Sequence, residues 1–121
     1  VNGGDTKKAQ SDAAVLLREN ADIKGFFGCN NTSTVGIVNT LFEEERIDVV
    51  LVGFDLADET KQMLQNPEYH AVTVLQKQDQ MGYLGMLSLN SLIKGEKSEQ
   101  KYFDTGVIMV DSDYLMENAV S

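Results

Sequence analysis

The sequence predicts an α/β fold, with a three-layer α/β/α arrangement around a mostly parallel sheet, and three observations support this prediction. Short apolar runs of strand length alternate along the 121 residues with longer segments whose apolar residues recur at helical spacing. The runs do not alternate with polar residues, which is typical of strands buried on both faces. The segments between the runs are long enough for right-handed crossovers. The expected order β-α-β-α-β-α-β covers most of the chain.

Length and charge limit the classes of function. A chain of 121 residues, 42% of them hydrophobic, is long enough for one domain with a core and too short for two ordinary ones. Nineteen acidic and ten basic residues give a formal net charge of −9, which opposes binding to a polyanion, so we expect no direct nucleic-acid partner. The apolar stretches are too short to span a bilayer. Because the chain starts at Val1 with neither an initiator Met nor a signal peptide, we interpret it as a piece of a longer protein.

The first half of the chain is expected to form two helices and two strands. Apolar residues at helical spacing predict helices over Thr6–Glu19 and Asn31–Glu44, and the first should cover the sheet. Asn31 or Thr32 is the expected N-cap of the second helix. The two predicted strands are Gly25–Cys29 and Val49–Phe54.

The second half continues the alternation. A short helix over Asp58–Gln65 should end at Asn66, because the proline that follows disfavours helical geometry in the residue before it. The remaining predicted elements are a strand at Ala71–Leu75, an extended run at Phe103–Val110 and a short helix starting at Ser112.

The segment Asp79–Lys94 is predicted to be a long helix with an unusual distribution of apolar residues. Asp79 is its expected cap and Gly95 its expected stop. Its apolar residues occupy more than one face, so we expect wide burial, with Met81 and Met86 in a core.

Three of the apolar runs end in a polar residue, and these residues form the candidate ligand site: Asn30, Asp55 and Gln76. If the runs are neighbouring parallel strands, these side chains meet at the carboxyl edge of the sheet, where open α/β sheets bind ligands. A carboxylate at Asp55 can accept hydrogen bonds from two hydroxyls of a polyol, and the two amides can donate and accept. Gly53 would let the backbone turn or a ligand approach.

Each of these residues also has an ordinary structural explanation. Asp55 is a common type of residue at the start of a turn, and Asn30 and Gln76 could be capping or surface residues. The repetition of polar residues at successive strand ends favours a site.

Other chemistry is disfavoured, so we expect no catalytic residue, metal or cofactor, and no enzyme. His70 precedes its strand, which places it at the opposite end of the sheet as an ordinary surface residue and leaves no Ser-His-Asp arrangement. Cys29 stands alone in an apolar run and is expected to be a buried, inert thiol. The chain has no phosphate-binding glycine motif. The acidic group at Asp111–Asp113 lacks the further ligands of a calcium loop and is more typical of a helix start.

Four blocks of sequence, in order and spacing, resemble a known family. Residues 16–27 (LLRENADIKGFF) resemble its pattern LL…NPDIKAIF, and residues 28–36 (GCNNTSTVG) resemble A-N-D-x-x-A-x-G. Residues 50–55 (VLVGFD) resemble V-V-G-F-D, and residues 74–82 (VLQKQDQMG) resemble V-x-Q-x-P-x-x-M-G. The family is the type I periplasmic binding proteins of the ribose/galactose class, and the resemblance is to their C-terminal part. Asn31 departs from the pattern's aspartate and Gln78 from its proline.

The resemblance implies that residues 1–121 are a single partial domain, the C-terminal lobe of a two-lobe binding protein with the type I fold. It also implies that Asn30, Asp55 and Gln76 contact a sugar, and that the other half of the site precedes Val1. Residues 79–102 would then pack on the missing N-terminal lobe. By itself, the chain is expected to bind sugars weakly and to self-associate through that exposed apolar surface.

The function implied by the resemblance is binding of a monosaccharide or related polyol, as the solute-binding component of a sugar ABC transporter. The partners would be an ABC permease or a membrane sensor, and the location periplasmic or extracellular and membrane-associated. An alternative is the effector-binding domain of a lactose-repressor-type transcription regulator, whose DNA-binding helices would lie upstream. A phospho-receiver domain is a weaker alternative, because Asn30-Asn31 is not the acidic pair that such a domain needs.

Overall fold

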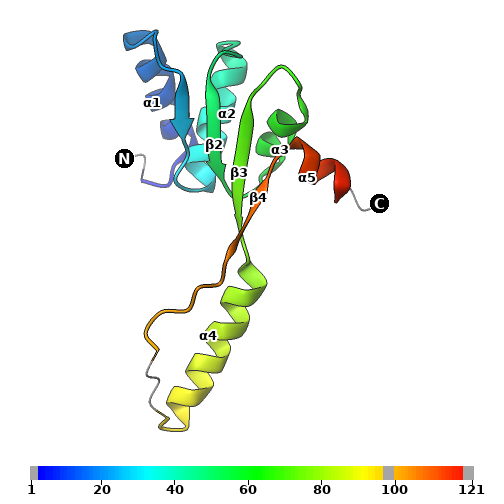
Figure 1. The fold of residues 1–121 in the computed structure, drawn as a ribbon. Coiled ribbons are helices and arrows are strands. Elements are labelled where there is room, and N and C mark those ends of the chain that lie inside the picture. Colours follow the sequence, from blue (N-terminus) through cyan, green and yellow to red (C-terminus); the bar gives the residue numbers. More distant parts are fainter. Residues whose placement is uncertain (1–2, 97–99, 119–121) are drawn as a thin grey trace. The chain divides into compact units, whose positions relative to one another are not determined.

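The structure is a computed structural model that describes residues 3–96 and 100–118, and the chain forms two compact units (Figure 1). Unit 1 comprises residues 1–75 and 109–121, and unit 2 comprises residues 76–108. The helices are α1 (Thr6–Glu19), α2 (Asn31–Glu43), α3 (Asp58–Gln65), α4 (Gln78–Ile93) and α5 (Ser112–Glu117). The strands are β1 (Gly25–Phe27), β2 (Val50–Phe54), β3 (Ala71–Gln76) and β4 (Val107–Val110).

The strands form one sheet in the order β1-β2-β3-β4, and β2 pairs in parallel with both β1 and β3. Phe27 lies opposite Val52, and Phe54 lies opposite Val74. The strands β1 and β2, which precede Asn30 and Asp55, and β3, which ends at Gln76, are therefore neighbours, as the sequence predicts. The mostly parallel α/β fold is confirmed.

The core of unit 1 lies between one face of the sheet and the helices α1, α2 and α3. Leu51 in the central strand is fully buried, and it clusters with buried residues of all three helices. These helix residues are Ala13, Leu17, Ile37, Val38, Leu41 and Met63. Figure 1 shows the three helices on the same side of the strands. The apolar helical spacing in the sequence thus identifies the faces that cover the sheet.

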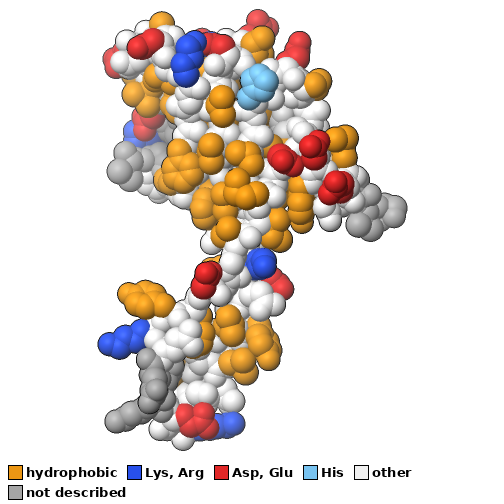
Figure 2. All heavy atoms as spheres, viewed as in Figure 1, with side chains coloured by type: hydrophobic (Ala, Val, Ile, Leu, Met, Phe, Trp, Pro, Cys, Tyr) orange, Lys and Arg blue, Asp and Glu red, His pale blue; other side chains and the backbone are white. Residues whose placement is uncertain are grey.

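The opposite face of the sheet is more open. Phe27 is 63% exposed and Val50 is 46% exposed, and Figure 2 shows apolar side chains gathered over the strands of unit 1. The expectation that the strand ending at Phe54 is buried on both faces is therefore wrong for the described residues. Burial along β2 alternates instead, because α1, α2 and α3 pack against the same face of the sheet.

Local signals at helix ends explain where the helices of unit 1 begin and stop. The carboxylate of Asp5 accepts a hydrogen bond from the backbone N–H of Lys8 at 3.0 Å and caps α1. The N-cap of α2 is Asn30, not Asn31 or Thr32 as expected. The helix α3 ends at Gln65, as predicted from the proline that follows Asn66.

Unit 2 contains α4, in which no residue is buried. The expectation of wide burial, with Met81 and Met86 in a core, is wrong for this unit, since Met86 is 67% exposed. The expected cap at Asp79 is also wrong, because the helix begins one residue earlier and Lys77 at its N-cap makes no capping side-chain bond. Gly95 follows the helix with a φ of 76° and supplies the expected stop.

Among the residues that the structure describes, no helix is both long enough and apolar enough to cross a membrane.

Candidate functional site

The structure places Asn30 and Asp55 at the carboxyl edge of the sheet in unit 1. Asn30 follows β1 and Asp55 follows β2. The two strands are in register through the pair Phe27 and Val52, and each site residue comes three positions after its member of that pair. The two residues are therefore brought to the same level of the edge, as the sequence predicts for parallel neighbours.

Asn30 has a fixed orientation because its side chain caps α2. Its Oδ1 accepts hydrogen bonds from the backbone N–H of Ser33 at 2.9 Å and from Thr32 Oγ1 at 3.1 Å. A backbone N–H can only donate, so the side-chain atom that faces Ser33 must be the oxygen. The Nδ2 group makes no hydrogen bond to the described residues, and Asn30 can therefore present two N–H donors to a ligand.

Asp55 has a fixed backbone in an uncommon conformation. Its φ is 64°, in the left-handed region that aspartate and asparagine tolerate better than most residues. Its N–H donates to the carbonyl of Val74 at 2.8 Å, and its own carbonyl accepts from Thr73 Oγ1 at 2.7 Å. The partly exposed carboxylate is thus carried on a backbone that is bonded on both sides, and a carboxylate is a strong acceptor.

Two glycines near the edge make room for threonines. A Cβ on Gly53 would lie 2.6 Å from Thr34 Cγ2 and 3.0 Å from Thr73 Oγ1, and a Cβ on Gly28 would lie 2.9 Å from the backbone nitrogen of Thr34. The sequence predicts that Gly53 allows a turn or the approach of a ligand, but in the structure it packs against these two threonines. The residue with the left-handed backbone conformation is Asp55. Sequence reasoning missed both threonines, and the glycines were the available signal of a close approach.

Gln76 is the last residue of β3 and the first residue of unit 2, and it is partly exposed. Of the three candidate residues, Asn30 and Asp55 come together within unit 1, and Gln76 belongs to the other unit.

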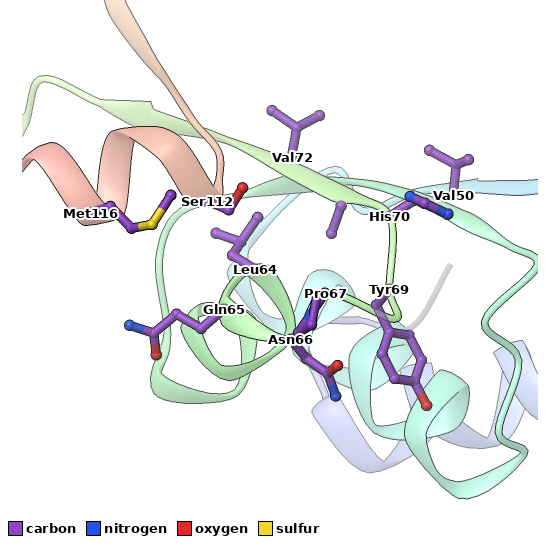
Figure 3. A pocket seen from close by; sticks show the side chains of 11 residues that line it. Val50, Leu64, Gln65, Asn66, Pro67, Tyr69, His70, Val72, Ser112 and Met116 are labelled. Atoms are coloured by element: carbon purple, nitrogen blue, oxygen red, sulfur yellow. The ribbon is translucent and has the colours of Figure 1, made fainter.

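The opposite end of the sheet carries His70, which is exposed and directly precedes β3, as predicted. It lines a hollow of about 690 Å³ together with residues of β2, α3, the loop before β3, and α5 (Figure 3). In Figure 3, Leu64 and Pro67 lie on one side of β3, and Val72 projects from the other. Burial, followed by the charges of nearby glutamates, raises the pKa of Tyr69 in this wall.

The charged residues near this amino end bond to one another. Asp48 accepts from Lys24 Nζ at 2.7 Å and from Arg46 Nε at 2.7 Å. The hydrogen bonds from Arg46 and then from Lys24 lower the pKa of Asp48 well below its ordinary value. Arg46 also donates to the carbonyl of Ile23 at 3.3 Å, so this network ties the segments that lead into β1 and β2.

Cys29 is exposed, so the expectation of a buried thiol is wrong. The strand β1 ends at Phe27, which leaves Cys29 in the loop before α2 without the packing of a strand residue. Its Sγ lies 3.8 Å from Ser33 Oγ.

The described residues contain no cluster of three His, Cys, Asp or Glu side chains that could hold a metal ion. Asp111 caps α5, where its Oδ1 accepts from the N–H of Tyr114 at 2.8 Å, as expected for a helix start.

A parallel sheet with hydrogen-bonding groups at its carboxyl edge is the arrangement in which open α/β sheets commonly bind ligands. The family model described as "Periplasmic binding protein domain" matches residues 1–97, and the chain belongs to this family. The resemblance found in the sequence is thereby confirmed. The relatives are named as binding proteins and not as enzymes.

The chain is similar to the ribose import binding protein of Escherichia coli (strain K12), with 30% identity over 87 residues that cover 72% of this chain and 29% of the relative. It is also similar to the structure of an ABC transporter solute-binding protein from Agrobacterium vitis with bound D-fucose. That match has a TM-score of 0.84 and 27% identity, and it covers 98% of this chain and 41% of the other. A carbohydrate transporter solute-binding protein from Agrobacterium radiobacter in complex with D-arabinose matches with a TM-score of 0.83 and 27% identity, over 97% of this chain and 39% of the other. The chain thus spans less than half the length of these relatives.

Proposed function

We propose that this chain provides one lobe of a sugar-binding protein that delivers a monosaccharide or related polyol to an ABC transporter. The observation that carries the proposal is that two residues follow neighbouring strands at the carboxyl edge of the sheet. Asn30 has an oriented side-chain donor, and Asp55 has an acceptor on a backbone fixed by hydrogen bonds. A sugar hydroxyl both donates and accepts, so such a pair can bind one hydroxyl or two adjacent ones.

The three candidate residues have distinct roles in this proposal. Nδ2 of Asn30 donates to a sugar oxygen, because its Oδ1 is held by α2. The carboxylate of Asp55 accepts from one or two hydroxyls through charge-assisted hydrogen bonds. Gln76, at the end of β3, contributes an amide that can donate and accept.

The two-lobe arrangement is also part of the proposal. Residues 1–121 form part of the C-terminal lobe, and residues 79–102 pack on the N-terminal lobe, where the rest of the sugar site lies. The exposed apolar residues of α4 support this placement, since a helix with no buried residue has an unused apolar surface. Closure of two lobes over the sugar would create the form that a permease or a membrane sensor recognises, in a periplasmic or extracellular membrane-associated location.

The 121-residue chain alone is then expected to bind sugars weakly and to self-associate through α4. Light scattering that shows a stable monomer, together with no binding of a dye that reports apolar surface, would contradict the self-association.

The function is tested by titration calorimetry of the full-length gene product with D-ribose, D-fucose, D-arabinose and a wider panel of monosaccharides and polyols. We expect at least one of them to bind with a dissociation constant in the micromolar range or below. Absence of binding across the panel would contradict the proposal. The lactose-repressor-type alternative is not favoured, because the relatives found are binding proteins for transport.

A further inference from the structure

Thr34 is fully buried in the first turn of α2, and its hydroxyl joins the two loops that carry Asn30 and Asp55. Its Oγ1 donates to the carbonyl of Asn30 at 2.9 Å. The same oxygen accepts from the backbone N–H of Phe54 at 2.9 Å, directly before Asp55. One hydroxyl therefore bonds to the backbone of one candidate ligand residue and to the neighbour of the other.

The position of this hydroxyl is explained by the way β1 and β2 separate. The N–H of Val50 donates to the carbonyl of Lys24 at 2.9 Å, so the same ladder continued four residues further would pair the N–H of Phe54 with the carbonyl of Gly28. Instead, Thr34 Oγ1 lies between the N–H of Phe54 and the carbonyl of Gly28, at 3.4 Å from the carbonyl oxygen. The hydroxyl thus satisfies an N–H that the shorter strand β1 no longer reaches.

Close packing holds the threonine in this place. Its methyl group lies against Gly53 and its backbone against Gly28, where no Cβ would fit.

We propose that Thr34 is a positioning residue that sets the spacing between the Asn30 donor and the Asp55 acceptor, and thereby which sugars fit between them. This inference rests on the proposed function. The hydroxyl holds the edge at the point where β1 and β2 diverge, and a change in that spacing alters which pairs of sugar hydroxyls can bond to both residues.

The test compares three variants of the full-length gene product by titration with D-ribose, D-fucose and D-arabinose. Thr34→Val keeps the shape and removes the hydroxyl, whereas Thr34→Ser keeps the hydroxyl. Thr40→Val is the matched control, because Thr40 is also buried in α2 and its Oγ1 bonds to the carbonyls of Gln10 and Gly36, away from the sheet edge.

We expect Thr34→Val to lose about tenfold in affinity for the sugar that binds most tightly, and to change the order or ratio of affinities among the three sugars. Thr34→Ser should stay within about twofold of the unmodified protein. Thr40→Val should lower Tm by ~5 °C and leave both affinity and preference unchanged.

The inference is overturned if Thr34→Val binds within about twofold of the unmodified protein with the same preference. It is also overturned if Thr34→Ser loses as much affinity as Thr34→Val, or if Thr40→Val does. If the valine variant does not fold, Thr34→Ala, which also removes the hydroxyl, takes its place in the same comparison.

Amide hydrogen exchange separates this inference from the proposed function. Loss of the hydroxyl should speed exchange at the N–H of Phe54 and shift the amide resonance of Asp55, and the Thr40 control should do neither. If the unmodified protein binds no sugar, the proposed function fails, and unchanged exchange at Phe54 would still contradict the positioning role of Thr34.

Discussion

The two ends of the parallel sheet use their polar residues in different ways. At the amino end, Lys24, Arg46 and Asp48 bond to one another and tie the entries to β1 and β2. At the carboxyl end, Oδ1 of Asn30 caps α2, the carbonyl of Asp55 accepts from Thr73 Oγ1, and Nδ2 of Asn30 has no partner among the described residues. The hollow of about 690 Å³ lies at the amino end, yet the oriented donor and acceptor lie at the other. We therefore base the proposed site on the oriented hydrogen-bonding groups at the carboxyl end and not on the size of the hollow at the amino end.

The largest expected effect is at the acceptor. Asp55→Asn keeps a residue type that tolerates the left-handed conformation and removes the charge, so the fold should be unaffected. Loss of charge-assisted hydrogen bonds should weaken sugar binding on the order of 100-fold in the full-length protein. Calorimetry measures the affinity and thermal unfolding controls for stability. An unchanged dissociation constant would remove Asp55 from the site.

A substitution at Asn30 can test its proposed role as a ligand donor separately from its role as the N-cap of α2. Serine is as good an N-cap as asparagine, so Asn30→Ser should change the free energy of unfolding by less than about 0.5 kcal/mol. Serine has no amide group to donate to a ligand, so the affinity of the full-length protein for the sugar should fall about tenfold. Retained affinity in this variant would mean that Asn30 only caps α2.

Some of the features at the two ends of the sheet can be predicted from the order of residues along the chain, and others cannot. The positions of Asn30 and Asp55 are predictable because parallel strands place their carboxyl ends at one edge. Thr34 and Thr73 are not predictable from periodicity, because their role depends on where neighbouring strands separate in three dimensions. The end of a strand is also the reason for the exposure of Cys29. The apolar run predicts a buried thiol, but β1 ends at Phe27, before this residue. The exposure of α4 likewise depends on what packs against it, which its own sequence does not specify.

At the amino end, Asp48 should contribute to stability and not to binding. Because the hydrogen bonds from Arg46 and Lys24 lower its folded-state pKa, its contribution is present above the unfolded pKa of about 3.9 and is lost as pH falls below that value. Asp48→Asn should therefore lower Tm at neutral pH, with a difference that shrinks in acid. Unfolding scans of both proteins across this range measure it. A difference that does not depend on pH, or a loss of sugar affinity, would contradict this assignment.

The smallest expected effect is at His70. The side chain is exposed and precedes β3, so His70→Ala should change sugar affinity by less than about twofold. Calorimetry under the conditions used for the Asp55 variant gives the comparison. A clear loss of affinity would place a ligand at the amino end.

The most direct test is a titration of the isotope-labelled full-length protein with its tightest-binding sugar, followed through the backbone amide resonances. We predict that the amides around Asn30, Asp55 and Gln76 shift with saturation, and that those around His70 and Asp48 do not. Shifts confined to His70 and the walls of the amino-end hollow, with Asn30 and Asp55 unchanged, would contradict a sugar site at the carboxyl edge.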